Sequence, residues 1–123
     1  MTAPNIVNVT AIYGNTYGAA LTTADSFFVN NIQSSGKVYK INSLYISNVN
    51  GTAAADVNVT LNSAYVTASA NTKIASTISV PADSTLVLIT KDTSFYLKEE
   101  CKINITANAN SHLEAVISWD EIT

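Results

Sequence analysis

The sequence predicts an all-β protein: one antiparallel β-sandwich or jelly-roll-like domain over residues 1–123, with about eight strands. Three observations support this prediction. Apolar and polar residues alternate with a period of two in several short segments. Turn-forming residues such as Gly, Asn, Ser and Pro separate these segments. No segment of ten or more residues carries the 3.6-residue apolar spacing and the capping residues of a helix.

The predicted strands follow one another at short intervals along the chain. In order, the segments with strand character are 7–13, 26–29, 38–49, 55–62, 74–80, 85–90, 101–108 and 113–120. Segments 55–62 and 101–108 are apolar on one face and polar on the other, so each covers a core on one side. Segment 85–90 is apolar on both faces, which predicts a central strand or one covered by a partner. Residues 16–31 are the least regular, leaving room for an extended arm or irregular loop within residues 1–31.

The segment 38–49 has an interruption in its alternation. Its apolar residues change phase between Ile41 and Leu44, which predicts a β-bulge near Asn42 and Ser43. The pair Asn50-Gly51 follows this segment, and Asn-Gly is a strong hairpin signal because both central residues of a type I′ turn need positive φ. We therefore expect a bent strand that joins the next one through a hairpin with a lengthened loop.

The composition excludes several classes of function. The chain has six lysines, no arginine and nine acidic residues, for a formal net charge of −3. Because binding to phosphate backbones needs clustered basic side chains, nucleic acid is not an expected partner. No apolar run approaches the roughly 20 residues of a membrane helix, so no membrane partner is expected either. One cysteine permits no intramolecular disulfide, which fits synthesis in a reducing cytoplasm.

Residues that could carry chemistry are few, and none forms a recognisable site. His112 is the sole histidine, which excludes sites built on several imidazoles, and it follows a turn. Cys101 is expected to be buried on the apolar face of its strand. Glu99 and Glu100 are expected to be solvated charges at a strand end. The sequence therefore predicts a protein that is not an enzyme, with no catalytic, cofactor-binding or metal-binding residues.

Tyrosine is the residue type that most suggests a surface role. The chain has six, at positions 13, 17, 39, 45, 65 and 96. Tyrosine suits interfaces that are apolar at one end and wet at the other. The segment 38–46 combines two of them with apolar residues of both phases, so it is the preferred region for contact with a neighbouring subunit. The candidate contact residues are Val38, Tyr39, Leu44, Tyr45, Ile46 and Trp119.

Longer motifs resemble a known family. The run SGKVYKINSLYISNVNGTAAADVNVTL, followed by ISVPADSTLVLITKDTSFYLKEECKINITANANSHLEAVISWDEI, resembles small virion structural proteins of tailed phages, notably cyanophages. That family has an SGxVYxIxxLxxxNxxGxxxADVxV segment, a VPAxSTLxxI turn and strand, a YLxEGD-like corner and a strand ending near Y-E-E-I. The resemblance spans residues 35–122. The corner at residues 96–101 lacks the family's Gly-Asp pair, and Trp119 stands in place of the terminal tyrosine.

The resemblance implies a non-enzymatic virion component, assembled in the host cytoplasm. The main expectation is a capsid decoration or cement protein, a trimer that stabilises the shell by contacts among its own copies and with other virion proteins such as the major capsid protein. Two alternatives stay open. One is a neck-, tail- or fibre-associated virion protein. The other is a carbohydrate- or receptor-binding β-sandwich module with Tyr39, Tyr45 or Trp119 as stacking platforms.

Overall fold

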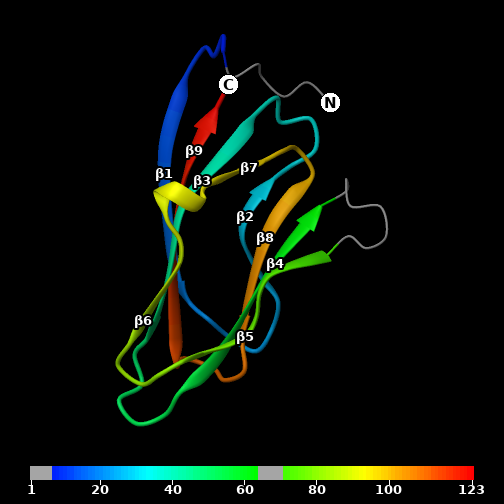
Figure 1. Ribbon diagram of the computed structural model, residues 1–123. Helices are drawn as coiled ribbons and strands as arrows, with labels where there is room; N and C mark the ends of the chain where they lie inside the picture. The colour runs from blue at the N-terminus through cyan, green and yellow to red at the C-terminus, as the bar shows by residue number, and fades with distance from the viewer. Residues whose placement is uncertain (1–6, 64–70) are drawn as a thin grey trace.

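The fold is an antiparallel β-sandwich (Figure 1). The computed structural model describes residues 7–63 and 71–123. Sheet A has the strand order β1 (Ile12–Ala20), β9 (Leu113–Ile122), β3 (Val38–Asn48) and β6 (Thr85–Ile89), and the short β7 (Phe95–Leu97) also pairs with β3. Sheet B has the order β2 (Ser26–Asn31), β8 (Cys101–Ala107), β4 (Ala55–Ser63) and β5 (Asn71–Val80). The predicted all-β sandwich is confirmed, and β7 brings the described strands to nine.

The core lies between the inner faces of the two sheets. Sheet A contributes Leu44, Ile46 and Ile117, and sheet B contributes Ile103 and Ile105, all with no exposed surface. These residues come from the alternating segments of the sequence, because every second side chain of a strand points to the same face. Each fully buried side chain of this size stabilises the fold by roughly 1.5–3 kcal/mol. Among the described residues, the helical structure is limited to the 3₁₀ turn η1 (Lys91–Thr93).

The predicted bulge in β3 is confirmed. The register between β3 and β9 shifts between Ile41 and Ser43. The extra residue reverses the phase of the strand, so Tyr39 and Ile41 before it and Leu44 after it all face the core. The apolar residues that differ in phase along the sequence, Ile41 before the bulge and Leu44 after it, therefore lie on the same face of the strand.

The predicted hairpin at Asn50-Gly51 is wrong. β3 pairs with β9, β6 and β7 in sheet A, whereas β4 pairs with β5 and β8 in sheet B, so the loop crosses between the sheets. The buried Asn48 organises this crossing. Its Nδ2 donates hydrogen bonds to the carbonyl oxygens of Ala53 at 2.9 Å and Val80 at 2.8 Å, and its Oδ1 accepts one from the Asn50 amide at 2.9 Å. These bonds satisfy backbone groups of the loop and of the end of β5.

The start of the chain is more regular than its composition suggests. The first described strand begins at Ile12 and runs to Ala20, so most of the predicted strand 7–13 lies outside it and part of the region expected to be irregular lies inside it. The predicted strand from Ser26 is confirmed, and residues 21–25 form the loop before it. Residues 1–6, where an arm was expected to begin, lie outside the described residues.

The corner between β7 and β8 corrects another expectation. Glu99 is 1% exposed and therefore buried, whereas it was expected to be solvated. Glu100 adopts a left-handed backbone with φ of 64°, and the Cys101 amide donates to the Lys98 carbonyl oxygen at 3.2 Å to close the turn. In the YLxEGD pattern the glycine falls at the position of Glu100. Glu100 thus adopts the left-handed backbone conformation that glycine would favour at this position.

Candidate assembly surface

The free edge of β1 lacks the features that usually protect a sheet edge. β1 has nine residues, Ile-Tyr-Gly-Asn-Thr-Tyr-Gly-Ala-Ala, with no charge and no proline. It pairs with β9 from Ile12 to Ala20 without a register shift. A row of unpaired backbone N–H and C=O groups along a straight, uncharged strand is a template for pairing with another chain. β1 therefore offers a ready-made site for strand addition.

The other long edge strand, β5, is different. It carries Lys73, and its register with β4 shifts twice, between Val57 and Val59 and between Val59 and Thr60. Thr77 has a left-handed backbone with φ of 52°, and its amide donates to the Asn58 side chain at 3.0 Å. A charge and bulges are the devices by which proteins keep an edge from pairing. The edge at β5 is thus protected against pairing with another chain, whereas the edge at β1 is not.

The exposed tyrosines gather on sheet A. Tyr13 and Tyr17 lie on β1, Tyr45 on β3 and Tyr96 on β7, and all four are exposed. The Tyr17 ring also meets Phe28 of sheet B edge-on, with centroids 5.4 Å apart. Tyr65 lies outside the described residues. The tyrosines thus mark sheet A as the surface most like an interface.

A row of apolar residues crosses the outer face of sheet A from edge to edge. Gly18 pairs with Val116, Val116 with Tyr45, and Tyr45 with Val87. The exposed fractions are 41% for Val116, 42% for Tyr45 and 49% for Val87. The rows on either side are mainly hydroxyls, with Thr16 beside Ser118 and Ser47 beside Thr85. Charged side chains of β9 interrupt these polar rows beside β1, because Glu114 pairs with Ala20 and Asp120 pairs with Gly14.

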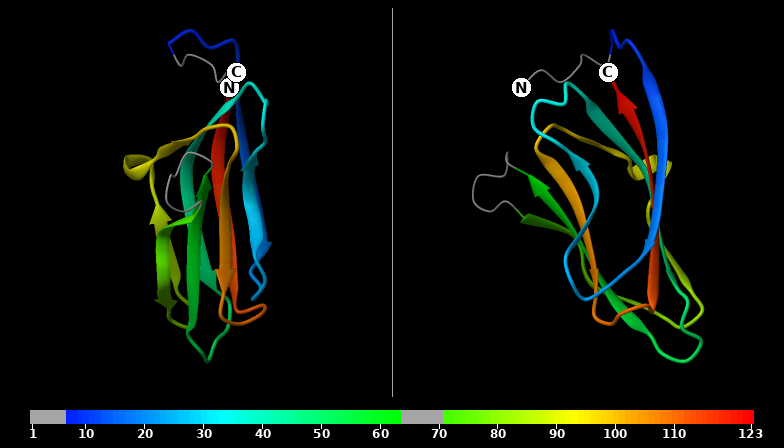
Figure 2. Two further views of the ribbon diagram at one scale, coloured as in Figure 1. Left: turned by 90° about the vertical axis from the view of Figure 1, so that its right-hand side faces the viewer. Right: turned by 180° about the vertical axis from the view of Figure 1, so that it is seen from behind.

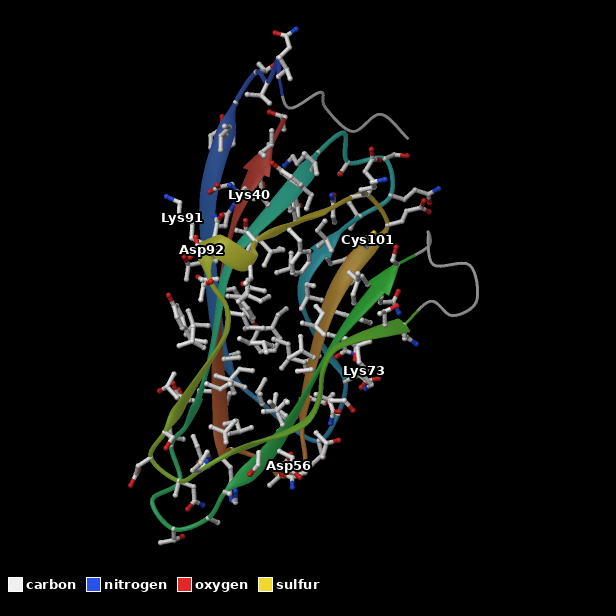
Figure 3. The ribbon with its side chains drawn as sticks, viewed as in Figure 1. Lys40, Asp56, Lys73, Lys91, Asp92 and Cys101 are labelled. Atoms are coloured by element: carbon white, nitrogen blue, oxygen red, sulfur yellow. The ribbon has the colours of Figure 1, made fainter. Side chains whose placement is uncertain are left out.

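An apolar groove opens beside β6, at the side of the sandwich opposite β1. The left view of Figure 2 shows β5 and β6 along one side and β1 and β2 along the other. The groove has a volume of about 410 Å³ and is lined by Leu61, Ile74, Leu88, Ile89, Thr93 and Phe95. Lys91 and Asp92 project from η1 near this side (Figure 3). β6 was predicted to be central or covered by a partner; it is an edge strand, which leaves the second alternative.

The six predicted contact residues divide between the interior and the surface. Val38, Tyr39, Leu44 and Ile46 are buried within the chain, so their side chains are not available to a partner. Tyr45 is exposed at the centre of the apolar row. The bulge keeps Ile41, Leu44 and Ile46 all on the core side of β3 and leaves Tyr45 on the outer face. A sugar-stacking platform at Tyr39 is excluded for the same reason.

Trp119, the sixth predicted contact residue, is partly buried beside Tyr39. Their ring centroids are 6.3 Å apart, and the Trp119 Nε1 is buried with no hydrogen-bond partner among the described residues. Burial raises the pKa of the Tyr39 phenol, and the charge and hydrogen bond of Glu121 raise that pKa further. Tyr39 is buried, whereas the Glu121 side chain is 22% exposed and pairs with Lys37 at 3.3 Å, so this cluster lies at the margin of the interior.

The candidate chemical residues lie apart from one another. His112 follows a turn as predicted, with Nε2 3.2 Å from the Asn50 Nδ2. Cys101 is buried as predicted, and its Sγ donates to the Ser63 Oγ at 3.2 Å. Within residues 7–63 and 71–123, no three His, Cys, Asp or Glu side chains come together in a way that could hold a metal ion. In the same part of the chain, no helix has the length and apolar character to cross a membrane.

The sequence did carry one signal for the β1 edge. Residues 1–24 contain no charged side chain, and the first charge is Asp25. Two glycines and weak alternation hid the strand, because strand signals depend on apolar residues that face a core. Most residues of β1 do not face a core, since seven of its nine positions are exposed.

The comparisons with known proteins give a structural likeness alone. No protein-family model matches the chain, and no curated protein matches it. A solved structure described as "Bacillus endospore appendages form a novel family of disulfide-linked pili" has 18% sequence identity and a TM-score of 0.52. The alignment covers 92% of this chain and 87% of that chain. The chain therefore shares its β-sandwich fold with a subunit of a polymeric appendage.

Proposed function

We propose that this chain is a non-catalytic structural subunit that polymerises with copies of itself by adding the β1 edge of one copy to the β6 edge of the next. The observation that carries the proposal is the straight, uncharged and exposed edge of β1. The likeness to a subunit of pili adds support, since a related fold forms a polymer.

The choice of acceptor edge follows from symmetry. Pairing of β1 with β1 of another copy is a two-fold contact that ends at a dimer, whereas pairing of two different edges can continue without limit. β6 is the opposite edge of the same sheet. A contact between β1 and β6 makes sheet A continuous from subunit to subunit, and the apolar row from Gly18 to Val87 continues with it.

The groove beside β6 supplies apolar contact for the incoming strand. Its lining residues Leu88, Ile89 and Phe95 belong to the β6 side, and Leu61 and Ile74 belong to the β4–β5 side. Ile12, Tyr13 and Tyr17 of β1 are exposed and can cover such a surface. Covering apolar surface stabilises the contact by roughly 25 cal/mol per Å², before the costs of association.

The proposed contact is non-covalent. The structure of similar fold is described as disulfide-linked, but this sequence has one cysteine. A single thiol per chain can join two copies at most, and Cys101 is buried against Ser63. Backbone hydrogen bonds and apolar burial therefore replace disulfides as the link in our proposal.

The virion setting is a further part of the proposal, and the sequence resemblance to phage proteins supports it. Within that setting, the likeness to a pilus subunit favours a tail- or fibre-associated position over a capsid cement. The trimer, the contact with a capsid protein and the location in the virion rest on the resemblance alone. A polymer joined edge to edge can extend into a fibre, whereas a closed trimer has no free edge from which to extend.

Placing a lysine on the β1 edge tests the proposal. Thr16→Lys puts a charge on an exposed position of β1, where burial of the ammonium against a second strand is unfavourable. We expect the wild-type chain to form polymers in negative-stain electron microscopy and light scattering, and Thr16→Lys to remain monomeric. Thr72→Lys makes the same change on the protected edge β5 and should polymerise like the wild type.

Two results would contradict the proposal. One is a wild-type chain that stays monomeric at high concentration. The other is a Thr16→Lys variant that is folded by circular dichroism and still forms the same polymers.

A further inference from the structure

The outer face of sheet B differs from that of sheet A in carrying a polar depression. Residues paired across the four strands form a row: Phe27 of β2, Asn104 of β8, Thr60 of β4 and Lys73 of β5. This row lines a depression of about 350 Å³. Asn62 and Asn71, from the next row, and Asp25, just before β2, complete the lining. The volume is at the lower end of the range of about 300–1,000 Å³ seen for small-molecule sites.

We propose that this depression binds a short, uncharged oligosaccharide. The proposal goes beyond polymerisation and does not depend on it. Phe27 is the aromatic platform, because its side chain is 50% exposed and lines the depression. The C–H-rich face of a sugar ring packs on such a ring while its hydroxyls reach the neighbouring polar groups.

The Phe27 ring is in contact with a lysine side chain before any ligand binds. The Lys102 ammonium lies 4.6 Å from the ring centroid, in a cation–π contact. Phe27 lines the depression, whereas Lys102 does not. A platform held in place before binding loses little side-chain freedom when the ligand arrives.

The amides around Phe27 have unused hydrogen-bonding capacity. The Asn104 Oδ1 accepts a bond from the Ser26 amide at 3.0 Å, which leaves its Nδ2 as a donor without a partner among the described residues. The Asn62 Nδ2 donates to the Asn71 Oδ1 at 2.8 Å, which leaves the Asn62 Oδ1 as an acceptor without a partner in the same part of the chain. Donors and acceptors side by side match vicinal hydroxyls, each of which is both.

The charges indicate a neutral ligand. Asp25 and Lys73 both line the depression and have opposite formal charges. Lys73 lies on sheet B, on the side away from sheet A (Figure 3). A phosphate or a uronate would gain from the lysine and lose from the aspartate, whereas a neutral sugar uses both as hydrogen-bond partners.

A peptide strand is a poorer fit for this face. β8 lies between β2 and β4, and β4 lies between β8 and β5, so the backbone groups at the floor of the depression are used within the sheet. A ligand here meets side chains rather than a free strand edge. Recognition through amides, a hydroxyl and one aromatic ring is chemistry suited to a saccharide.

Calorimetric titration with neutral trisaccharides tests this site. Maltotriose, cellotriose, xylotriose and N,N′,N″-triacetylchitotriose are each titrated into the full chain, and at least one should give saturable binding. Phe27→Ala and Asn62→Ala should each weaken that binding by about tenfold or more, the effect of losing one good contact. Tyr45→Ala, which removes an exposed aromatic residue from sheet A instead, should bind as the wild type does.

Several outcomes would overturn the assignment. They are the absence of saturable heat with all four sugars, binding that survives both Phe27→Ala and Asn62→Ala, and a preference for inorganic phosphate or glucuronate over the neutral sugars. Because Phe27 and Asn62 lie on the surface of sheet B, the polymers formed through β1 should persist in both variants. Failure of sugar binding and failure of polymerisation are therefore distinguishable.

Discussion

The two long edge strands of the sandwich, β1 and β5, have similar lengths and opposite character. β1 has nine residues and β5 has ten. β1 is uncharged and keeps one register with its neighbour, whereas β5 carries Lys73, two register shifts and a left-handed residue at Thr77. Protection of a sheet edge has a cost in strand regularity. This contrast is the reason that our proposal assigns pairing to β1 and not to β5.

The outer faces of the two sheets repeat this contrast. Sheet A presents the apolar row of Val116, Tyr45 and Val87, and sheet B presents amides, a hydroxyl and one aromatic ring around a depression. An apolar row is suited to contact with protein, and a polar depression is suited to a small polar ligand. The two proposals thus place assembly on sheet A and ligand binding on sheet B.

Loss of polymers in Thr16→Lys is the largest effect expected from altering these edges. The next largest comes from removing a protective device of β5. Asn58→Ala deletes the side-chain oxygen that accepts a hydrogen bond from the Thr77 amide at 3.0 Å, so the left-handed turn loses its support. We expect a loss of about 1 kcal/mol in the free energy of unfolding, measured by urea denaturation.

Hydrogen exchange gives a local readout of the same change. The Thr77 amide should exchange faster in Asn58→Ala, while the amides of β1 should be unchanged. Asn30→Ala is the control, since Asn30 is an exposed asparagine on sheet B whose side chain makes no hydrogen bond among the described residues. Equal stability of Asn58→Ala and Asn30→Ala would show that Asn58 does not hold the bend in β5.

A smaller effect is expected at Glu100, another residue with a left-handed backbone. No residue of β1 has positive φ, whereas Thr77 and Glu100 do. Glu100→Gly removes a side chain from a backbone that disfavours it, so we expect a gain of about 0.5–1 kcal/mol in unfolding free energy. Glu114→Gly, in the extended strand β9, should instead lose about 0.5–1 kcal/mol. A loss of stability in Glu100→Gly would indicate that the glutamate side chain, rather than the backbone, stabilises this corner.

Much of the fold could be predicted from the sequence because one-sided burial leaves a period of two. The strands β4 and β8 and the bulge in β3 follow from that pattern. The pattern does not state which sheet a strand joins. For that reason the loop at Asn50-Gly51 was expected to close a hairpin, and the apolar β6 was expected to be either central or covered by a partner, of which its edge position excludes the first.

The candidate sites were harder to predict for a related reason. Apolar residues such as Leu44 and Ile46 look the same in sequence whether they meet a core or a partner, and here they meet the core. Tyr45 was predicted as a contact residue and is exposed, which keeps that expectation open to test. The polar depression on sheet B joins residues from four strands, and its cross-strand register is a property of the folded chain alone.

Disulfide cross-linking between engineered cysteines tests most directly whether β1 pairs with β6. Gly14→Cys, Thr16→Cys and Gly18→Cys, each combined with Val87→Cys, place one thiol on each outer edge at three possible registers, while Cys101 stays buried. After assembly and oxidation, we expect at least one double variant to give a ladder of covalent multimers on a denaturing gel and the single variants to give none. Polymers that form without a ladder in any double variant, or covalent dimers from Thr16→Cys alone, would contradict the account.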